Sequence, residues 1–266
     1  MPPTLEQARQ FRSDGCTTIP DMFDAREVSA MVAELERFKQ EGWLRNVATD
    51  GDGKTTSTTS QNLQICPIQP KSRFYRALPF HPKVVEVVGA LIGDPFVFYL
   101  DQIFLKPGKT GAGTGWHQDN SYFKVADPAK GTGMWVALHD ATVANGTMHV
   151  IPGSHRESFA HERDPGSDHH IRMQADESKA VPIELPAGGA LFFNFGVAHC
   201  TKANTTDRER AGLALHFLHA HHIPGRTAWP PATPLLSGPD ADGGKAIYGE
   251  DFRGAFPREV DRMLAA

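Results

Sequence analysis

Two stretches early in the chain carry apolar residues at helical spacing. Asp24 and Glu27 occupy the N-cap and N3 positions of a capping box, directly before apolar residues at positions 28, 31, 32, 35 and 38. This pattern predicts an amphipathic helix over roughly residues 25–41. A second, shorter helix is predicted to begin at Pro82, to carry apolar residues at positions 84, 85, 88 and 91, and to end at Gly93.

After Gly93 the apolar residues come in short runs that are rich in aromatic and β-branched side chains, as in strands. Strands are predicted over residues 96–106, 134–139, 148–151, 181–185, 190–195 and 211–218. Turn-forming pairs such as Asn145–Gly146 and Gly188–Gly189 separate several of these runs. Because no helical pattern alternates with the strands, we expect a mainly β fold with flanking helices, built as an antiparallel sandwich or barrel.

Three segments lack either pattern. Residues 46–61 are polar and rich in Gly and Thr, and residues 161–180 are charged, so both are predicted to be loops and candidate lids over a site. Residues 223–250 are rich in Pro and Gly and are expected to wrap the surface. We therefore expect one domain over residues 1–266, with a helical N-terminal part over about 1–95, a β core over about 96–220 and a tail over about 221–266.

Composition narrows the possible functions. The 266 residues include 27 basic and 31 acidic side chains, a net charge of −4, and no basic cluster of the kind that binds nucleic acid. No apolar run is long enough to cross a membrane, and residues 1–10 are too polar for a signal peptide. The three cysteines are scattered, which predicts no disulfide framework and favours a reducing, cytoplasmic location. A small-molecule partner fits this composition, whereas the oligomeric state has no signal in it.

The sequence GWHQDNS, residues 115–121, sets His117 and Asp119 two positions apart. On a strand, this spacing places both side chains on one face. An imidazole and a carboxylate on an inward face are costly to desolvate unless something binds them, so a metal site is one interpretation and a polar surface strand is the other. Two His and one carboxylate form the ligand set of non-haem iron sites, and His199, just after a predicted strand, is the natural third ligand.

Arg210 opens the last predicted strand, eleven positions after His199, and shares a strand face with Gly212 and Ala214. A guanidinium beside a small residue leaves room for a carboxylate ligand, which Arg can bind through two parallel hydrogen bonds.

Two further pairs of residues have the same spacing as parts of this arrangement. His155 stands two residues before Glu157, but it follows a Pro-Gly-Ser turn, where capping is the expected role. His161 and Arg172 repeat the eleven-residue separation, but they lie in a charged segment without a strand pattern.

Several ordered motifs together resemble the phytanoyl-CoA dioxygenase family of iron(II)- and 2-oxoglutarate-dependent oxygenases. The resemblance runs from about residue 9 to residue 220, through FRSDGCTTIPDMF, YLDQIFLKPG, GTGWHQDNSYF, NGTMHVIPGSH and AHCTKANTTDRERAGLALHF. It implies a double-stranded β-helix, also called a jelly-roll or cupin-like core, with iron held by His117, Asp119 and His199.

The same resemblance implies residues for 2-oxoglutarate and the substrate. It implies that Arg210 and Thr201 hold 2-oxoglutarate, that Gln102 and Trp135 line its pocket, and that Asn62 or Gln64 occupies a further pocket position. Arg208, two residues before Arg210, is expected on the same strand face but outside the barrel, and Cys200 is expected to pack on the side opposite His199.

The implied activity is hydroxylation of a small molecule at a C–H bond, with O2 consumed and succinate and CO2 released. The oxidant would form at the iron, so no separate protein acid or base is expected. Desaturation or rearrangement at the same iron site, and a jelly-roll binding protein without turnover, remain as alternatives. Halogenation is disfavoured because relatives that halogenate replace the carboxylate ligand, whereas Asp119 is present.

Overall fold

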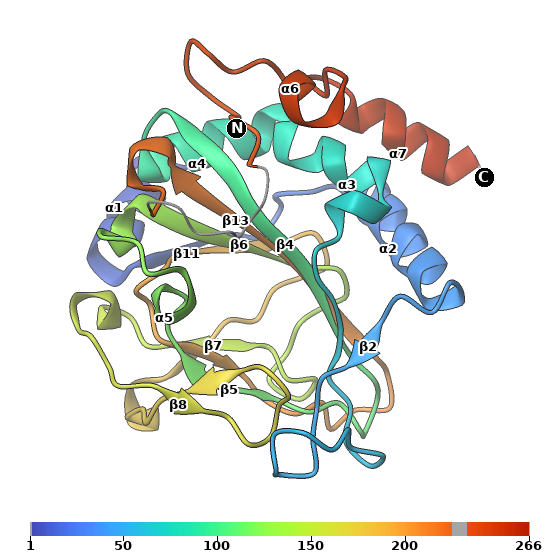
Figure 1. Ribbon diagram of the computed structural model, residues 1–266, viewed down its shortest axis with the longest axis vertical. Coiled ribbons are helices and arrows are strands. Elements are labelled where there is room, and N and C mark those ends of the chain that lie inside the picture. Colours follow the sequence, from blue (N-terminus) through green and yellow to red (C-terminus); the bar gives the residue numbers. More distant parts are fainter. Residues whose placement is uncertain (1, 225–232, 266) are drawn as a thin grey trace.

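Two antiparallel sheets face each other in the computed structural model, which describes residues 2–224 and 233–265 (Figure 1). The larger sheet has seven strands in the order β1-β11-β6-β13-β4-β3-β2, and the smaller has four in the order β10-β7-β12-β5. The strands are β1 (Cys16–Ile19), β2 (Arg45–Asn46), β3 (Leu63–Ile65), β4 (Phe96–Lys106), β5 (Thr114–His117), β6 (Gly131–Ala137), β7 (Met148–Val150), β10 (Val181–Pro182), β11 (Ala190–Asn194), β12 (His199–Thr201) and β13 (Arg210–His219). This arrangement is the double-stranded β-helix, as predicted.

Helices cover the outer face of the larger sheet (Figure 1). They are α1 (Leu5–Asp14), α2 (Ala25–Gln40), α3 (Arg73–Ala77), α4 (Pro82–Ile92) and α7 (Phe256–Ala265), while the short α5 (Asn120–Phe123) and α6 (Lys245–Tyr248) lie elsewhere. Leu213 and Leu215 of β13 pack with these helices in the main apolar core. Because neighbouring residues of a strand point to opposite faces, Arg210, Gly212 and Ala214 face the smaller sheet instead.

The local signals for the two predicted helices are confirmed. Asp24 caps α2, and a capping box with Glu27 is present. Pro82 begins α4, and Gly93 follows its last residue. The helix α1 has its own capping box, formed by Thr4 and Gln7, which the sequence interpretation missed. It also missed α7, which packs on α2.

The predicted strands exist, and the larger sheet extends beyond them. Strands β1, β2 and β3 come from the part of the chain expected to be helical, and they occupy both edges of the larger sheet. These strands are two to four residues long and too short for a period-two pattern. Part of the predicted wrapping tail, residues 225–232, lies outside the described residues.

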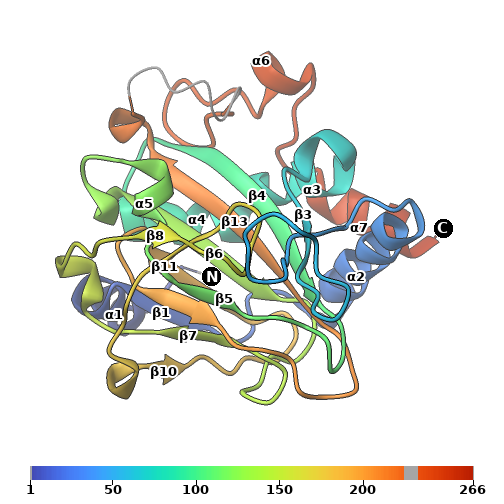
Figure 2. The same ribbon diagram turned by 60° about the horizontal axis from the view of Figure 1, so that its bottom comes forward.

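The two predicted lid segments join each other. We call residues 46–61 and 161–180 together the clasp (Figure 2). Thr49 N donates to Gly166 O at 3.1 Å, Gly53 N to Pro165 O at 2.8 Å and Asp168 N to Val47 O at 3.0 Å. The second segment contains a short hairpin, β8 (Glu162–Arg163) and β9 (Ile171–Arg172), where a loop was expected.

The sequence predicts neither disulfides nor membrane-spanning helices. All three cysteines are free, in agreement with the predicted lack of disulfides. Within residues 2–224 and 233–265, no helix combines the length and the apolar character needed to cross a membrane.

Candidate active site

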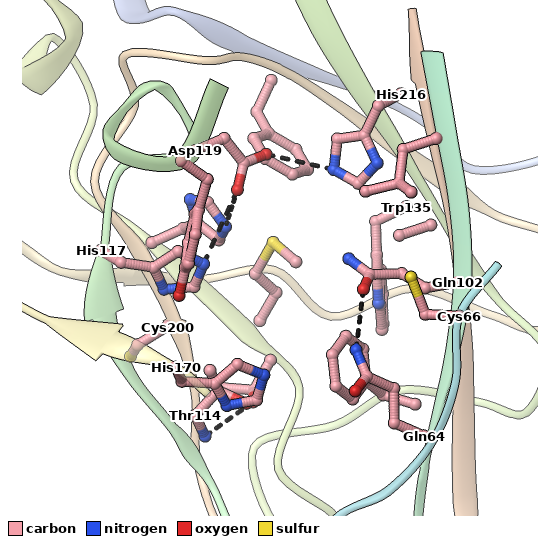
Figure 3. Close-up of a pocket in the computed structure, with 18 of the residues that line it drawn as sticks. Gln64, Cys66, Gln102, Thr114, His117, Asp119, Trp135, His170, Cys200 and His216 are labelled. Carbon is pink, nitrogen blue, oxygen red and sulfur yellow. Dashed lines mark hydrogen bonds and ion pairs between the residues drawn. The ribbon is translucent and has the colours of Figure 1, made fainter. Parts of the chain in front are cut away.

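His117, Asp119 and His199 converge between the two sheets (Figure 3). Their candidate ligand atoms all lie within 4.8 Å of one another. Asp119 Oδ1 is 3.7 Å from His117 Nε2 and 3.6 Å from His199 Nε2. The side chains are only 12%, 8% and 5% exposed for His117, Asp119 and His199. Within the described ranges, no other group of His, Cys, Asp and Glu has a geometry that could hold a metal ion.

The smaller sheet positions the two histidines. His117 ends β5, His199 begins β12, and the two residues are direct partners in the antiparallel register. A turn after β11 carries the chain from the larger sheet into β12, and Gly196 N donates to Asn194 Oδ1 in that turn at 3.0 Å. Gln118 Nε2 donates to Gly196 O at 2.6 Å, so the residue between His117 and Asp119 is tied to the turn that delivers His199.

Asp119 does not share a strand face with His117, which corrects the expectation from the spacing. Strand β5 ends at His117, and Asp119 has helical dihedral angles, φ −57° and ψ −31°, at the start of α5. The chain therefore bends immediately after His117, and the bend brings the carboxylate back toward both imidazoles.

Backbone carbonyls orient both imidazoles. His117 Nδ1 donates to Gly115 O at 2.8 Å and His199 Nδ1 donates to Val197 O at 2.9 Å. A proton on Nδ1 leaves the lone pair on Nε2, the atom that faces Asp119. Two imidazole nitrogens and one carboxylate oxygen form the facial ligand set that suits non-haem iron(II), so the residues present fit that metal.

Burial and charge set the protonation states of the ligands. Burial lowers the pKa of His117 to about 3, helped by His199 and opposed by Asp119. Burial alone would raise the pKa of Asp119, but His199, His216 and His117 hold that pKa below its ordinary value. His117 is therefore a neutral imidazole and Asp119 a carboxylate at neutral pH, which are the states that bind metal.

His216 is a neighbour of the ligands that the sequence interpretation missed. Its Nε2 lies 3.2 Å from Asp119 Oδ2, but the contact is too poorly aligned to satisfy that buried oxygen fully (Figure 3). The signal was available, because His216 continues the series Arg210, Gly212, Ala214 along one face of β13.

Arg210 lies in the same cavity and is a buried cation with no acidic partner in the part of the chain that the structure describes. It is 0% exposed, its Nη2 donates to Gly146 O, and its Nε has no hydrogen-bond partner among residues 2–224 and 233–265. The guanidinium carbon is 5.5 Å from the centre of the Trp135 ring. Burial lowers the pKa of Arg210 to about 9. A buried cation with an unused donor fits an anionic ligand such as the distal carboxylate of 2-oxoglutarate.

Gly212 makes room for Trp135. A Cβ at Gly212 would lie 2.3 Å from Trp135 Nε1, so any larger residue would displace the indole. The space beside Gly212 is therefore occupied by the Trp135 indole, whereas the sequence interpretation expected it to admit a carboxylate ligand.

The cavity has a volume of about 520 Å³ and brings together most of the predicted site residues. It is lined by the three metal-ligand candidates and by Gln64, Gln102, Trp135, Thr201 and Arg210. Gln64 Nε2 donates to Gln102 Oε1 at 2.9 Å on the wall opposite His117 (Figure 3). Thr201 Oγ1 accepts a hydrogen bond from Thr114 N at 3.2 Å, which leaves its own proton free to donate.

Asn62 and Arg208 do not line the cavity. Asn62 is buried but is not among the lining residues, and its Nδ2 donates to Thr114 Oγ1 at 3.3 Å. Arg208 is exposed as expected, but it precedes β13 and so does not share a strand face with Arg210.

The remaining candidates from the sequence lie outside the metal-ligand group. Cys200 is buried with Trp116 and Ile151 in an apolar cluster and also touches the cavity wall. His155 belongs to no metal-binding group among the described residues. His161 Nδ1 lies 2.8 Å from Ser121 Oγ and so packs beside the site.

Aromatic residues surround the open side of the ligand group. The Tyr122 ring is 5.9 Å from the ring of His117, and the Phe123 ring is 5.3 Å from the ring of His216. Tyr99 packs edge-on against Phe123 at 5.1 Å. Other lining residues that the sequence interpretation missed are Leu100, Phe104, Lys106, His169 and His170. His169 and His170 belong to the clasp, so the clasp reaches the cavity.

Comparison with known proteins agrees with this geometry. Residues 11–212 match the family described as phytanoyl-CoA dioxygenase (PhyH). The phytanoyl-CoA dioxygenase of Arabidopsis thaliana is 32% identical over 210 residues, which cover 77% of this chain and 70% of that protein. The ectoine dioxygenase of Sphingopyxis alaskensis is 28% identical over 236 residues, which cover 81% and 76% of the two chains.

Solved structures share the fold. The α-ketoglutarate-dependent epimerase SnoN from nogalamycin biosynthesis aligns with a TM-score of 0.69 and 24% identity, over 88% of this chain and 98% of that one. EctD from S. alaskensis with 2-oxoglutarate and 5-hydroxyectoine aligns with a TM-score of 0.65 and 24% identity, over 83% and 78%.

Proposed function

This chain belongs to the phytanoyl-CoA dioxygenase family, and on that basis we propose that it is an iron(II)- and 2-oxoglutarate-dependent dioxygenase that hydroxylates a small molecule at a C–H bond, with release of succinate and CO2. The observation that carries the proposal is the presence, in one cavity, of a His-Asp-His group and the unpaired buried cation Arg210.

In this proposal, His117, Asp119 and His199 hold the iron. Arg210 and the Thr201 hydroxyl hold the distal carboxylate of 2-oxoglutarate, while Gln102 and Trp135 line the space between. Iron(II), 2-oxoglutarate and O2 together supply the chemistry that breaks the C–H bond.

The protein orients the metal ligands and keeps water away from the reacting groups. The carbonyls of Gly115 and Val197 keep both Nε2 lone pairs directed at the metal position, so the ligands need no reorganisation when the metal binds. The aromatic side chains near His117 and His216 exclude water on the side from which a substrate would approach. A protein acid or base is not required by this arrangement.

A small-molecule substrate is supported by the size of the cavity. Its volume of about 520 Å³ lies within the range of roughly 300–1,000 Å³ that is usual for small-ligand sites. We place the substrate beside Tyr99, Leu100, Tyr122 and Phe123, because these residues line the part of the cavity that lies away from Arg210. The clasp is the proposed lid, since His169 and His170 line the cavity.

Rearrangement or ring closure at the same site is a second candidate, because structures with this fold are named an epimerase and a carbocyclase. The mass of the product separates the candidates. Hydroxylation adds one oxygen atom, desaturation or ring closure removes two hydrogens, and epimerisation leaves the mass unchanged.

The proposal is tested with protein loaded anaerobically with Fe(II). Addition of 2-oxoglutarate should produce a weak visible absorption band, and a panel of small molecules with O2 should be scored by succinate release. If neither the band nor succinate appears, and Zn(II) binds in place of iron without turnover, the chain is a jelly-roll binding protein instead.

A further inference from the structure

Lys106 is a second buried basic residue beside Arg210. It is the last residue of β4, it lies directly opposite Arg210 in the register of β4 and β13, and both residues line the cavity. Lys106 is only 1% exposed. Its Nζ donates to Ala112 O at 2.5 Å and to Lys202 O at 2.7 Å. The second of these bonds holds the amino group next to Thr201.

Neither basic side chain has a protein counter-charge among the described residues. Within those ranges, neither Lys106 nor Arg210 makes an ion pair with a carboxylate, and Asp119 is the only acidic residue that lines the cavity. Asp119 faces three histidines at the metal end. Two positive charges in a buried site are costly unless a ligand brings negative charge to them, so without a ligand Lys106 holds its proton weakly.

We propose that Lys106 is a further cosubstrate-binding residue, which acts with Arg210 on the distal carboxylate and makes the site selective for 2-oxo dicarboxylic acids over 2-oxo monocarboxylic acids. This rests on the proposed function, in which 2-oxoglutarate is the cosubstrate. Once Lys106 is protonated, the two backbone carbonyls take two of its three Nζ protons, so the third is available to the ligand carboxylate.

The charge state of Lys106 gives a specific signature. Burial holds the pKa of Lys106 well below its ordinary value, and Arg210 lowers it further. The titratable or charged groups that act on it are Arg210 from β13 and Cys200 from β12. Lys202 turns its side chain away to Glu177, and Lys109 pairs with Asp207. A carboxylate placed beside Lys106 raises its pKa again, so binding of the diacid should take up a proton.

The experiment compares two ligands on metal-loaded protein by calorimetry. 2-Oxoglutarate and 2-oxopentanoate have the same chain length, but only the first has a distal carboxylate. Lys106→Gln can still donate to the carbonyls of Ala112 and Lys202 but carries no charge. We expect this variant to bind 2-oxoglutarate about tenfold more weakly, the effect of losing one charge-assisted hydrogen bond, and to bind 2-oxopentanoate as the wild type does. The matched control is Lys109→Gln, an exposed lysine, which should change neither affinity.

Proton uptake is measured in the wild type with buffers of different ionisation enthalpy. We expect uptake with 2-oxoglutarate, little with 2-oxopentanoate, and loss of the difference in Lys106→Gln. An equal loss of affinity for both acids would mean that Lys106 only holds the strand ends, and would overturn the proposal. If the variant does not fold, the wild type alone still tests the proposal, because equal proton uptake for the two acids would overturn it. The proposed function itself would be overturned if the wild type bound metal but no 2-oxoglutarate. Calorimetry of the wild type shows this result before any variant is made.

Discussion

Arg210, Gly212 and His216 point from β13 toward the smaller sheet, and each contributes differently to the cavity. Arg210 brings positive charge, Gly212 leaves space for the Trp135 indole, and His216 contacts the outer oxygen of Asp119 at 3.2 Å. The cosubstrate end and the metal end of the site are thus connected by one strand. A single-residue shift of β13 would replace these side chains with those of the opposite face, such as Leu213 and Leu215.

Replacement of Arg210 by Ala should weaken 2-oxoglutarate binding by at least about tenfold, because a hydrogen bond to a charged group contributes about 1.5–3 kcal/mol and its loss leaves the ligand carboxylate unpaired. Metal binding should be unchanged, since the guanidinium does not touch the ligand group. The measurement is the apparent affinity for 2-oxoglutarate.

Arg208→Ala is the control for Arg210→Ala, because Arg208 is exposed and precedes the strand. It should have little effect, and Arg210→Lys should restore binding only in part, since Lys lacks the two-pronged geometry. A large loss in Arg208→Ala alone would mean that the register of β13 is wrong.

His117→Ala and Asp119→Ala should each lose stoichiometric Fe(II) binding while the fold persists, because each removes one of only three ligands. Anaerobic metal titration and circular dichroism check this outcome. His155→Ala serves as the control, since this histidine lies outside the ligand group. Wild-type iron stoichiometry in either ligand variant would remove that residue from the metal site.

At the scale of elements, Glu27 joins α2 to α4. It completes the capping box of α2, and it also lies 3.1 Å from His81 Nε2 and 3.1 Å from Lys83 Nζ. Burial alone would raise the pKa of Glu27, but hydrogen bonds from His81, from the Asp24 backbone and from Lys83 lower it from 4.5 to about 2. One carboxylate thus stabilises the N-terminal ends of both helices.

Glu27→Gln should destabilise the protein by about 1.5–3 kcal/mol at pH 7, the contribution of a hydrogen bond to a charged group. Because the folded-state pKa lies below the unfolded one, the stabilising effect is complete above about pH 5 and is lost as the pH falls from there toward 2. Urea unfolding of wild type and variant between pH 7 and pH 3 should show the difference shrinking with acid.

Glu162→Gln is the comparison for Glu27→Gln, since Glu162 pairs with Arg172 on the surface with 61% of its side chain exposed. Its effect should stay within about 0.5 kcal/mol at every pH. A Glu27→Gln difference that did not vary with pH would show that packing, and not the charge, is responsible.

The elements that could be predicted from the sequence are those with local signals. Asp24 and Pro82 mark helix starts through backbone chemistry that needs no tertiary contact. Strands β1, β2 and β3 depend on partners far along the chain, such as β11 for β1, so their short sequences do not reveal them. The bend that takes Asp119 out of β5 also arises from tertiary contacts, among them Gln118 bound to Gly196.

At the scale of the whole molecule, the convergence of His117, Asp119, His199 and Arg210 on one cavity could be predicted, because each lies in a distinctive motif. The position of Lys106 could not be predicted in this way. Its proposed role depends on the strand register that sets it opposite Arg210, and residues 106 and 210 are 104 positions apart in the chain. Asn62 was expected in the pocket from the family resemblance, but it donates to the Thr114 hydroxyl, and Thr114 lines the cavity in its place.

Ligand binding should stabilise the whole fold, because metal and cosubstrate bind the folded state and satisfy buried polar atoms of Asp119 and Arg210. A ligand at about one hundred times its Kd adds about 2.7 kcal/mol, which corresponds to a rise of several degrees in Tm for a protein of roughly this size. Thermal melts under argon with chelator, with Fe(II), and with Fe(II) and 2-oxoglutarate should rise in that order.

In Arg210→Ala the increment from Fe(II) should remain, while the increment from 2-oxoglutarate should shrink. Equal increments in the variant and the wild type would show that the cosubstrate does not use this end of the cavity.

Arg210 is 0% exposed, whereas Tyr122, which lines the same cavity, is 38% exposed, so we expect ligands to enter on the Tyr122 side. A molecule bound beside Tyr122 lies in the path of anything that travels to Arg210. The order of events in time follows from this shape: 2-oxoglutarate must enter before the substrate, and succinate must leave after the product. Steady-state kinetics should therefore be sequential and ordered, and a large excess of substrate should slow turnover by shutting out the cosubstrate.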